Sequence, residues 1–199
     1  MRTKSSKLAL RVLSTATFLA MVSSIATAAF ADTYDLTKGS VTVNAKSDGT
    51  YVTQKAADGS FCTNESGKTL DNYKDETPVT LTSKGEETDN TAAIYTDRGV
   101  STTVTLDNVN IDASKTQDPA IYTGGNVTLE LDGDNTLTGG EGHAALEKHS
   151  NRTDKNYALT LQDETTGDGK TGSLTATGGD GGAGIGGACN DWYGGYANY

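Results

Sequence analysis

Beyond its first 31 residues, the sequence has few of the features that build helical proteins. It contains no segment with a helical hydrophobic period, and it is poor in leucine and methionine. Threonine, aspartate, asparagine and glycine are abundant instead. This composition is typical of an extracellular all-β protein with many turns. The length of 199 residues allows one domain.

Basic residues are also scarce once the N-terminal segment is set aside. Residues 1–31 contain four of the 16 lysines and arginines and none of the 26 acidic residues, so residues 32–199 carry 12 basic and 26 acidic side chains, a formal net charge of −14. Nucleic acids and anionic membranes need basic patches, and we expect neither as a partner. The charge is compatible with bound Ca²⁺, with neutral or cation-bridged sugars, or simply with solubility outside the cell.

The first 31 residues have the pattern of a secretory signal peptide. A positively charged stretch precedes the apolar segment 12–25, and an Ala-x-Ala cleavage pattern follows at residues 29–31. The apolar segment is interrupted by serine and threonine and is short for a membrane span. We expect cleavage after Ala31 and a secreted or cell-surface location with no membrane contact afterwards; an uncleaved anchor is the alternative.

Short phrases of alternating apolar and polar residues recur along the chain and predict β-strands. Residues 104–107 read VTLD and residues 127–130 read VTLE, 23 positions apart. Similar phrases lie at residues 79–82, which is 25 positions upstream of the first, and at residues 159–162 and 172–175. Three short strands in each unit, joined by glycine, asparagine and aspartate corners, are typical of a coil of a parallel β-helix.

A small residue followed by an aliphatic one recurs between these phrases. The pairs are Ala93-Ile94, Ala120-Ile121 and Ala145-Leu146, at spacings of 27 and 25 residues. A repeat of 20–50 residues predicts a solenoid or an array, in which stacking buries the apolar side of each coil. We therefore predict an all-β solenoid of about five coils, in which Ile94, Ile121 and Leu146 align. A β-sandwich is the alternative.

The sequence suggests three parts: the signal peptide at residues 1–31, an N-terminal cap and loop at residues 32–77, and β-helix coils at residues 78–199. In the cap, Asp48-Gly49 between two alternating runs is a strong turn signal. A cap is expected because the first coil of a solenoid is an open edge. The stretch 190–199 has no strand pattern, and we expect the chain to be a fragment of a longer protein.

Cys62 and Cys189 are the two cysteines. Secretion permits a disulfide, but a disulfide requires Cα atoms within about 7 Å of each other. Because the two cysteines lie at opposite ends of the predicted solenoid, we expect them not to pair with each other.

Three stretches resemble a family of secreted bacterial proteins, the carbohydrate-binding-domain β-helix proteins. They are YDLTKGSVTV at residues 34–43, TVTLDNVNI at residues 103–111, and GSLTATGG with AGIGG within residues 172–187. The resemblance covers nearly all of residues 34–187 and consists mostly of stacking and corner residues. It implies a right-handed parallel β-helix, calcium held at coil corners and affinity for acidic plant sugars such as polygalacturonate.

Oxygen-bearing side chains gather at corners of consecutive coils and form candidate calcium ligands. Ca²⁺ takes six to eight oxygens from carboxylates, carbonyls and water. The candidates are Asp132, Asp134 and Asn135 in one coil, and Asp107, Asn108 and Asp112 one coil earlier. Stacking would bring the two groups together. The spacing is not that of an EF-hand, and corners also prefer these residues in the absence of any ligand.

Two tyrosines form the candidate sugar platform. Tyr95 and Tyr122 each follow an aliphatic residue in matching repeats, so we expect them to align on one face. Side-chain stacking along the solenoid would explain the same pattern without a ligand. An acidic polysaccharide would instead need Ca²⁺ to bridge it to an acidic surface. A second aromatic cluster consists of Trp192, Tyr193, Tyr196 and Tyr199.

Pectin lyases and polygalacturonases share the predicted architecture, so catalysis is a rival hypothesis. A lyase needs an arginine or lysine base beside calcium-bound substrate, and neither Arg98 nor Arg152 lies in an evident acidic constellation. The carboxylate motifs of polygalacturonases are missing. His143 lacks the second flanking glycine of their pattern, and we place His149 in a polar, solvated loop. Two separated histidines do not make a zinc site.

The sequence therefore predicts a secreted, non-catalytic carbohydrate-binding module that takes an acidic polysaccharide with the help of Ca²⁺. The second hypothesis is a structural stalk or adhesin segment of a cell-surface protein, which the threonine-rich outer faces suit. A pectin lyase-like enzyme is the third.

Overall fold

The computed structural model describes residues 32–149, 157–163 and 171–187. These residues form β-strands, loops and one 3₁₀ turn, without any α-helix, and the prediction of an all-β fold is confirmed. None of them forms a helix long and apolar enough to cross a membrane. The predicted signal peptide, Arg152, Cys189 and the aromatic cluster at residues 192–199 lie outside the described residues.

An eight-stranded sheet and a seven-stranded sheet contain the strands of the described residues. The eight-stranded sheet bends because the long strand β11 (Asn126–Thr138) pairs with different neighbours along its two halves. We call its two parts the first and the second wing. The first wing comprises β1 (Asp32–Asp35), β5 (Val79–Thr82), β8 (Ser101–Asp107), the first half of β11, and β13 (Leu159–Gln162). The second wing comprises β6 (Glu87–Thr88), β9 (Asn110–Asp112), the second half of β11, and β14 (Gly172–Thr177).

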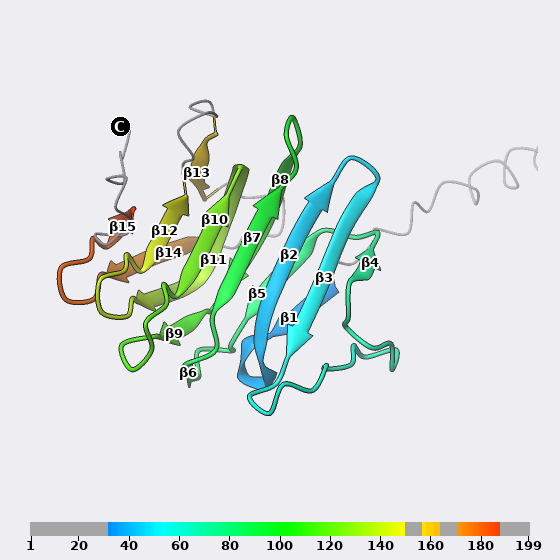
Figure 1. Ribbon diagram of the computed structural model, residues 1–199, viewed down its shortest axis with the longest axis horizontal. Coiled ribbons are helices and arrows are strands. Elements are labelled where there is room, and N and C mark those ends of the chain that lie inside the picture. The colour runs from blue at the N-terminus through cyan, green and yellow to red at the C-terminus, as the bar shows by residue number, and fades with distance from the viewer. Residues whose placement is uncertain (1–31, 150–156, 164–170, 188–199) are drawn as a thin grey trace, which may run out of the picture.

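The seven-stranded sheet runs across the front of the molecule in Figure 1. In spatial order it comprises β15 (Ile185–Gly186), β12 (Leu146–His149), β10 (Ile121–Gly124), β7 (Ala92–Thr96), β2 (Ser40–Lys46), β3 (Gly49–Lys55) and β4 (Tyr73–Asp75). The pairings between the strands of both sheets are parallel, except that β3 is antiparallel to β2 and to β4. This differs from the antiparallel sheets of a β-sandwich.

The chain passes through the first wing, the second wing and the seven-stranded sheet in the same order repeatedly. The passes run β5–β6–β7, β8–β9–β10, β11–β12 and β13–β14–β15, and β11 serves both wings. An earlier pass runs from β1 through the 3₁₀ turn η1 (Leu36–Lys38) to β2. Parallel pairing therefore begins at Asp32 and not near Pro78, where we expected the regular coils to start. The turn predicted at Asp48-Gly49 joins β2 to β3.

The core lies between the sheets and consists of the inward half of each alternating strand. Its largest side chains are almost fully buried: Leu36, Leu70, Leu81, Ile94, Leu106, Ile111, Ile121, Leu129, Leu137 and Leu146. Burying one such side chain stabilises a fold by about 1.5–3 kcal/mol relative to leaving it exposed. The apolar half of the repeated phrases thus supplies the core, as the alternation predicted.

The register between repeats differs from the predicted one at two places. Ile121 pairs with Leu146, as expected, but its partner on the other side is Ala92, while Ile94 pairs with Thr123. Similarly, Val104 lies opposite Leu129 and not Val127. Both shifts are of two residues, which leaves every side chain on the same face of its sheet. The hydrophobic pattern therefore fixes the face but does not distinguish these registers.

Candidate functional site

Three rings lie side by side on the outer face of the seven-stranded sheet, and we call them the aromatic row: Tyr95, Tyr122 and His149. Their neighbours Ile94 and Ile121 point into the core, and alternation along the strands turns the rings outward. The ring centroids of Tyr95 and Tyr122 lie 5.5 Å apart, and those of Tyr122 and His149 lie 5.8 Å apart. Tyr95 is 40% exposed. The two tyrosines share one face, as expected.

A glycine makes room for the rings. Gly124 lies between Tyr95 and His149 in the register of the sheet. A Cβ atom at Gly124 would lie only 3.1 Å from Cδ1 of Tyr95 and 3.7 Å from Cε1 of Tyr122. The two-residue register shift therefore places Tyr95 opposite Gly124 and not opposite Tyr122, and both tyrosine rings converge on the space that a side chain would fill.

His149 and Gly124 were missed by sequence reasoning. His149 was expected in a polar loop, but it is the last residue of β12, and its ring packs against Tyr122. The signal was the alternation in residues 146–149, where Leu146 is fully buried and His149 falls on the outer face. The role of Gly124 depends on the register and has no signal in the local sequence.

Polar and cationic groups continue the outer face beyond Tyr95. Asn44 on β2 pairs with Tyr95 and with Tyr51 on β3, and Tyr51 pairs with Lys74 on β4. The Lys46 ammonium lies 4.6 Å from the centre of the Tyr51 ring, within the range of a cation–π interaction. This end of the face therefore carries an amide, a ring and two lysines.

The opposite end of the face carries a buried carboxylate. Glu147 lies in register with Tyr122 and is 6% exposed. Its Oε2 atom lies 2.8 Å from Nδ1 of His143, so His143 orients the carboxylate when this nitrogen carries a proton. His143, which we had weighed only as a catalytic candidate, is in this arrangement a partner of Glu147.

Five of the six predicted calcium residues lie at the bend between the two wings. Asp107 and Asp132 are register partners on β8 and β11. Asn108 and Gly133 follow them with φ angles of 52° and 65°, a left-handed conformation that asparagine and glycine tolerate best. A Cβ atom at Gly133 would lie 2.5 Å from Oδ1 of Asn108. The geometry of this corner therefore requires glycine.

The fold itself uses several oxygen and nitrogen atoms of the bend. The Asn135 side chain is buried, and its Oδ1 accepts from the backbone N–H of Val109 at 2.9 Å. Its Nδ2 donates to the carbonyl oxygens of Asp132 and Ser173, each at 3.1 Å. Oδ1 of Asp134 accepts from the Ser173 hydroxyl at 2.9 Å. Asn135 thus joins three successive passes of the chain.

The sixth predicted residue, Asp112, lies elsewhere. It pairs with Thr138, four residues beyond Asp134, which is about 13 Å along a strand. Hydrogen bonds from Ser114 lower the pKa of Asp112, and the residue lines an open polar pocket with Glu87, Asp89 and Lys115. Among the described residues, no group of three or more His, Cys, Asp or Glu side chains is arranged to hold a metal ion. Calcium binding stays a prediction.

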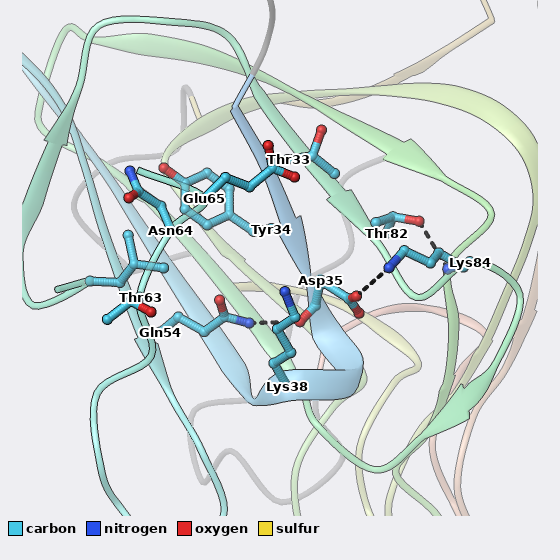
Figure 2. A pocket seen from close by; sticks show the side chains of 11 residues that line it. Thr33, Tyr34, Asp35, Lys38, Gln54, Thr63, Asn64, Glu65, Thr82 and Lys84 are labelled. Carbon is cyan, nitrogen blue, oxygen red and sulfur yellow. Dashed lines mark hydrogen bonds and ion pairs between the residues drawn. The ribbon is translucent and has the colours of Figure 1, made fainter. Parts of the chain in front are cut away.

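A small pocket lies beside β1, between residues 63–65 and Lys84 (Figure 2). The Lys84 ammonium points at Asp35 and lies 2.7 Å from Oδ2. Buried Gln54 donates from Nε2 to the backbone oxygen of Asp35 at 2.8 Å. These bonds tie the first pass of the chain to β3 and to the loop after β5, so we assign them to stability.

Two ionisable groups near this pocket have shifted pKa values. Burial of Asp35 acts to raise its pKa, but hydrogen bonds from Lys84 and Thr37 outweigh it and the pKa is lowered. Burial of Tyr34 and the hydrogen bond from its hydroxyl to Asp75, 2.7 Å long, raise the pKa of Tyr34 strongly. Both groups are therefore held in the protonation state that they have at neutral pH.

Cys62 is a free thiol in the described part of the chain. Its Sγ atom lies 3.5 Å from the backbone oxygen of Lys38, and burial raises the pKa of the thiol. Because Cys189 lies outside the described residues, the expectation that these two cysteines stay apart is still a prediction.

The fold and the outer face define the chain as an all-β protein with parallel sheets and an exposed row of rings. No protein-family model, no curated protein and no solved structure matches the chain. Function therefore has to be argued from the geometry above.

Proposed function

We propose that the protein is a secreted, non-catalytic carbohydrate-binding module built on a right-handed parallel β-helix. The repeated order of first wing, second wing and seven-stranded sheet supports the β-helix, since each pass places its strands beside those of the previous pass. Register partners 25 residues apart, such as Val79 with Val104 and Val104 with Leu129, support coils of that length.

The aromatic row carries the proposal for binding. Tyr95 and its neighbours present ring surface to solvent on the face of a regular sheet. A sugar ring has an apolar face of C–H groups, which stacks on an aromatic ring while its hydroxyls reach polar groups at the sides. Aromatic residues with a polar tip are suited to such half-wet contacts.

An acidic polysaccharide such as polygalacturonate is the class of ligand we favour. Lys46 and Lys74 lie beside Tyr51 at one end of the face and can pair with sugar carboxylates. The rest of the acidic surface would repel such a polymer unless cations bridge the two. We place Ca²⁺ in that role, with Asp107, Asp132 and Asp134 as its first candidate ligands.

A structural stalk is the second candidate, and the outer face of the first wing favours it. Threonines align there across adjacent strands: Thr80 with Thr105, and Thr103 with Thr128 and Thr160. Threonine favours strands through its branched Cβ atom, and its hydroxyl keeps the surface hydrated. Such a face suits rigidity and reach without a ligand.

A retention experiment separates these functions. The secreted protein is passed over immobilised polygalacturonate and a glycan array, with Ca²⁺ or with EDTA. Retention that EDTA abolishes supports the proposal, and no retention on any glycan supports the stalk. Unsaturated products that absorb in the ultraviolet would identify a lyase and refute the non-catalytic function.

A pair of matched variants tests the site. Tyr95→Ala removes a ring that is 40% exposed and lies in the aromatic row, whereas Phe61→Ala removes one that is 39% exposed and lies on a loop outside it. We expect Tyr95→Ala to abolish retention and Phe61→Ala to preserve it. Equal loss in both variants would show that the row has no special part in binding.

A further inference from the structure

The spacing of the aromatic row follows the spacing of the strands. Tyr95, Tyr122 and His149 come from β7, β10 and β12, which are consecutive in the sheet, and strands in a sheet lie about 4.8 Å apart. The two centroid distances, 5.5 Å and 5.8 Å, are slightly longer because the rings zigzag around Gly124. Each distance is close to the length of one sugar unit in a linear hexopyranose chain.

The rings are not coplanar. The planes of Tyr95 and Tyr122 make an angle of 47°, and those of Tyr122 and His149 make an angle of 31°. The sugars on the surface of a crystalline polysaccharide present parallel faces, and such a surface cannot stack on all three rings together. A single chain can rotate each sugar about the glycosidic bonds to follow the rings.

We propose that the aromatic row binds one soluble polysaccharide chain that crosses the strands, with one sugar on each ring and His149 as the third subsite. This inference rests on the proposed carbohydrate-binding function and specifies its ligand: the interior of a free chain, at least three sugars long, and not a chain end or a crystal surface. Glu147, held by His143 beside Tyr122, supplies a hydrogen-bond acceptor for the hydroxyls of the central sugar.

Chain length provides the first test. Calorimetry with galacturonic acid oligomers of one to six units, in Ca²⁺, should show affinity that increases up to the trimer, with little further gain per unit beyond the reach of the row. Cello-oligosaccharides of the same lengths provide a neutral series. Equal affinity for monomer and trimer in every series that binds would overturn the three-subsite arrangement.

His149 provides the second test. We expect His149→Ala to reduce trimer affinity by about five- to ten-fold, as expected for the loss of one aromatic contact, and to leave dimer affinity unchanged. His149→Tyr keeps a ring at the same position and should restore trimer binding. If His149→Ala has no effect on trimer binding while Tyr95→Ala abolishes it, the third subsite is refuted.

Gly124 tests the arrangement of the rings without removing any of them. Valine is favourable in a strand, and Gly124 needs no positive φ angle, but a side chain there would displace Tyr95 and Tyr122. We expect Gly124→Val to fold with an unchanged circular dichroism spectrum and to bind trimer at least ten-fold more weakly. Unchanged trimer binding by the folded variant would contradict the proposal.

Microcrystalline cellulose distinguishes the two levels of inference. Binding to soluble oligomers but not to the crystalline powder supports the single-chain ligand. Equal binding to both forms overturns the single-chain inference but leaves the proposed function intact. Failure to bind every soluble and crystalline glycan refutes the proposed function itself.

Discussion

The aromatic row and the bend at Gly133 both contain residues that the sequence marks for ligand binding, but the fold orients them differently. In the row, the rings of Tyr95 and Tyr122 lie on the outer face of a sheet. At the bend, the amide of Asn135 turns inward and bonds the backbone of three passes of the chain. The comparison teaches that polar residues at a corner are consumed by the backbone first, whereas outward rings stay available for a partner.

The largest expected effect is the loss of stability on breaking the bend. Asn135→Ala leaves the buried Val109 N–H and two carbonyl groups without their partner, at a cost of about 2–4 kcal/mol. Thermal unfolding followed by circular dichroism should show Tm lowered by about 5–10 °C, given about 2–4 °C per kcal/mol for a chain of this size.

Asn110→Ala is the matched control for the bend. The side chain of Asn110 makes one long hydrogen bond of 3.4 Å near the surface, so Tm should change little. If the two asparagine variants unfold at the same temperature, the amide of Asn135 is not the element that joins the coils.

The next effect concerns the row and should spare stability. Tyr122→Ala removes the central ring, and glycan affinity should decrease by about ten-fold or more, since a central, partly buried aromatic anchor carries a large share of a binding energy. Thr105→Ala on the outer face of the first wing serves as control and should leave affinity unchanged. A variant of Tyr122 that unfolds below 37 °C would reveal a packing role in place of a binding role.

Calcium distinguishes the two regions further. If Asp107, Asp132 and Asp134 hold the ion, adding Ca²⁺ should raise Tm by a few degrees through preferential binding to the folded state, and EDTA should reverse the change. Asp134→Ala should lower both calcium affinity and Tm, whereas Asp112→Ala, at the distant corner, should change neither calcium affinity nor the Tm increment. Equal behaviour of these two aspartate variants in a calcium titration would place the ion elsewhere.

The smallest effect is the contribution of Asp35 to acid stability. Because its pKa in the folded protein is lowered from the ordinary value of 3.8, ionised Asp35 stabilises the fold at neutral pH, and this contribution is lost as the pH falls below about 4. Asp35→Asn should therefore flatten the dependence of Tm on pH between pH 5 and pH 2. A variant with the full acid dependence of the parent protein would show that other carboxylates cause it.

Tyr34 gives the same comparison at alkaline pH. Its pKa is raised in the folded protein, so the neutral phenol stabilises the fold below pH 10, and the stabilisation decreases as the pH rises above that value. Tyr34→Phe should lose the hydrogen bond to Asp75 and reduce the alkaline decrease of Tm. An unchanged alkaline limb would assign that loss to other groups.

The repeat and its alternation could be predicted from local sequence, because a two-residue period is visible in any short strand. The buried partners Ile121 and Leu146 and the turn at Asp48-Gly49 were found in this way. The start of parallel pairing at Asp32 was not, because β1 and β2 read as ordinary strands until their partners, more than 45 residues away, are known.

The candidate site was only half visible in the sequence. Tyr95 and Tyr122 were found through their matching neighbours, but a register shift of two residues leaves the buried face unchanged and could not be detected. Gly124 and His149 acquire their roles through that shift. The inward orientation of Asn135 likewise depends on Ser173, which is 38 residues away in the chain.

The sequence by itself determined an all-β chain, the face to which each side chain points, and the acidic surface, because these follow from composition and from the two-residue period. Only the tertiary structure decided which residues lie opposite each other, and with them the convergence of three rings on Gly124 and the use of Asn135 inside the bend. The physical reason is that register is set by packing and hydrogen bonds between segments 25 or more residues apart, and no local pattern contains that information.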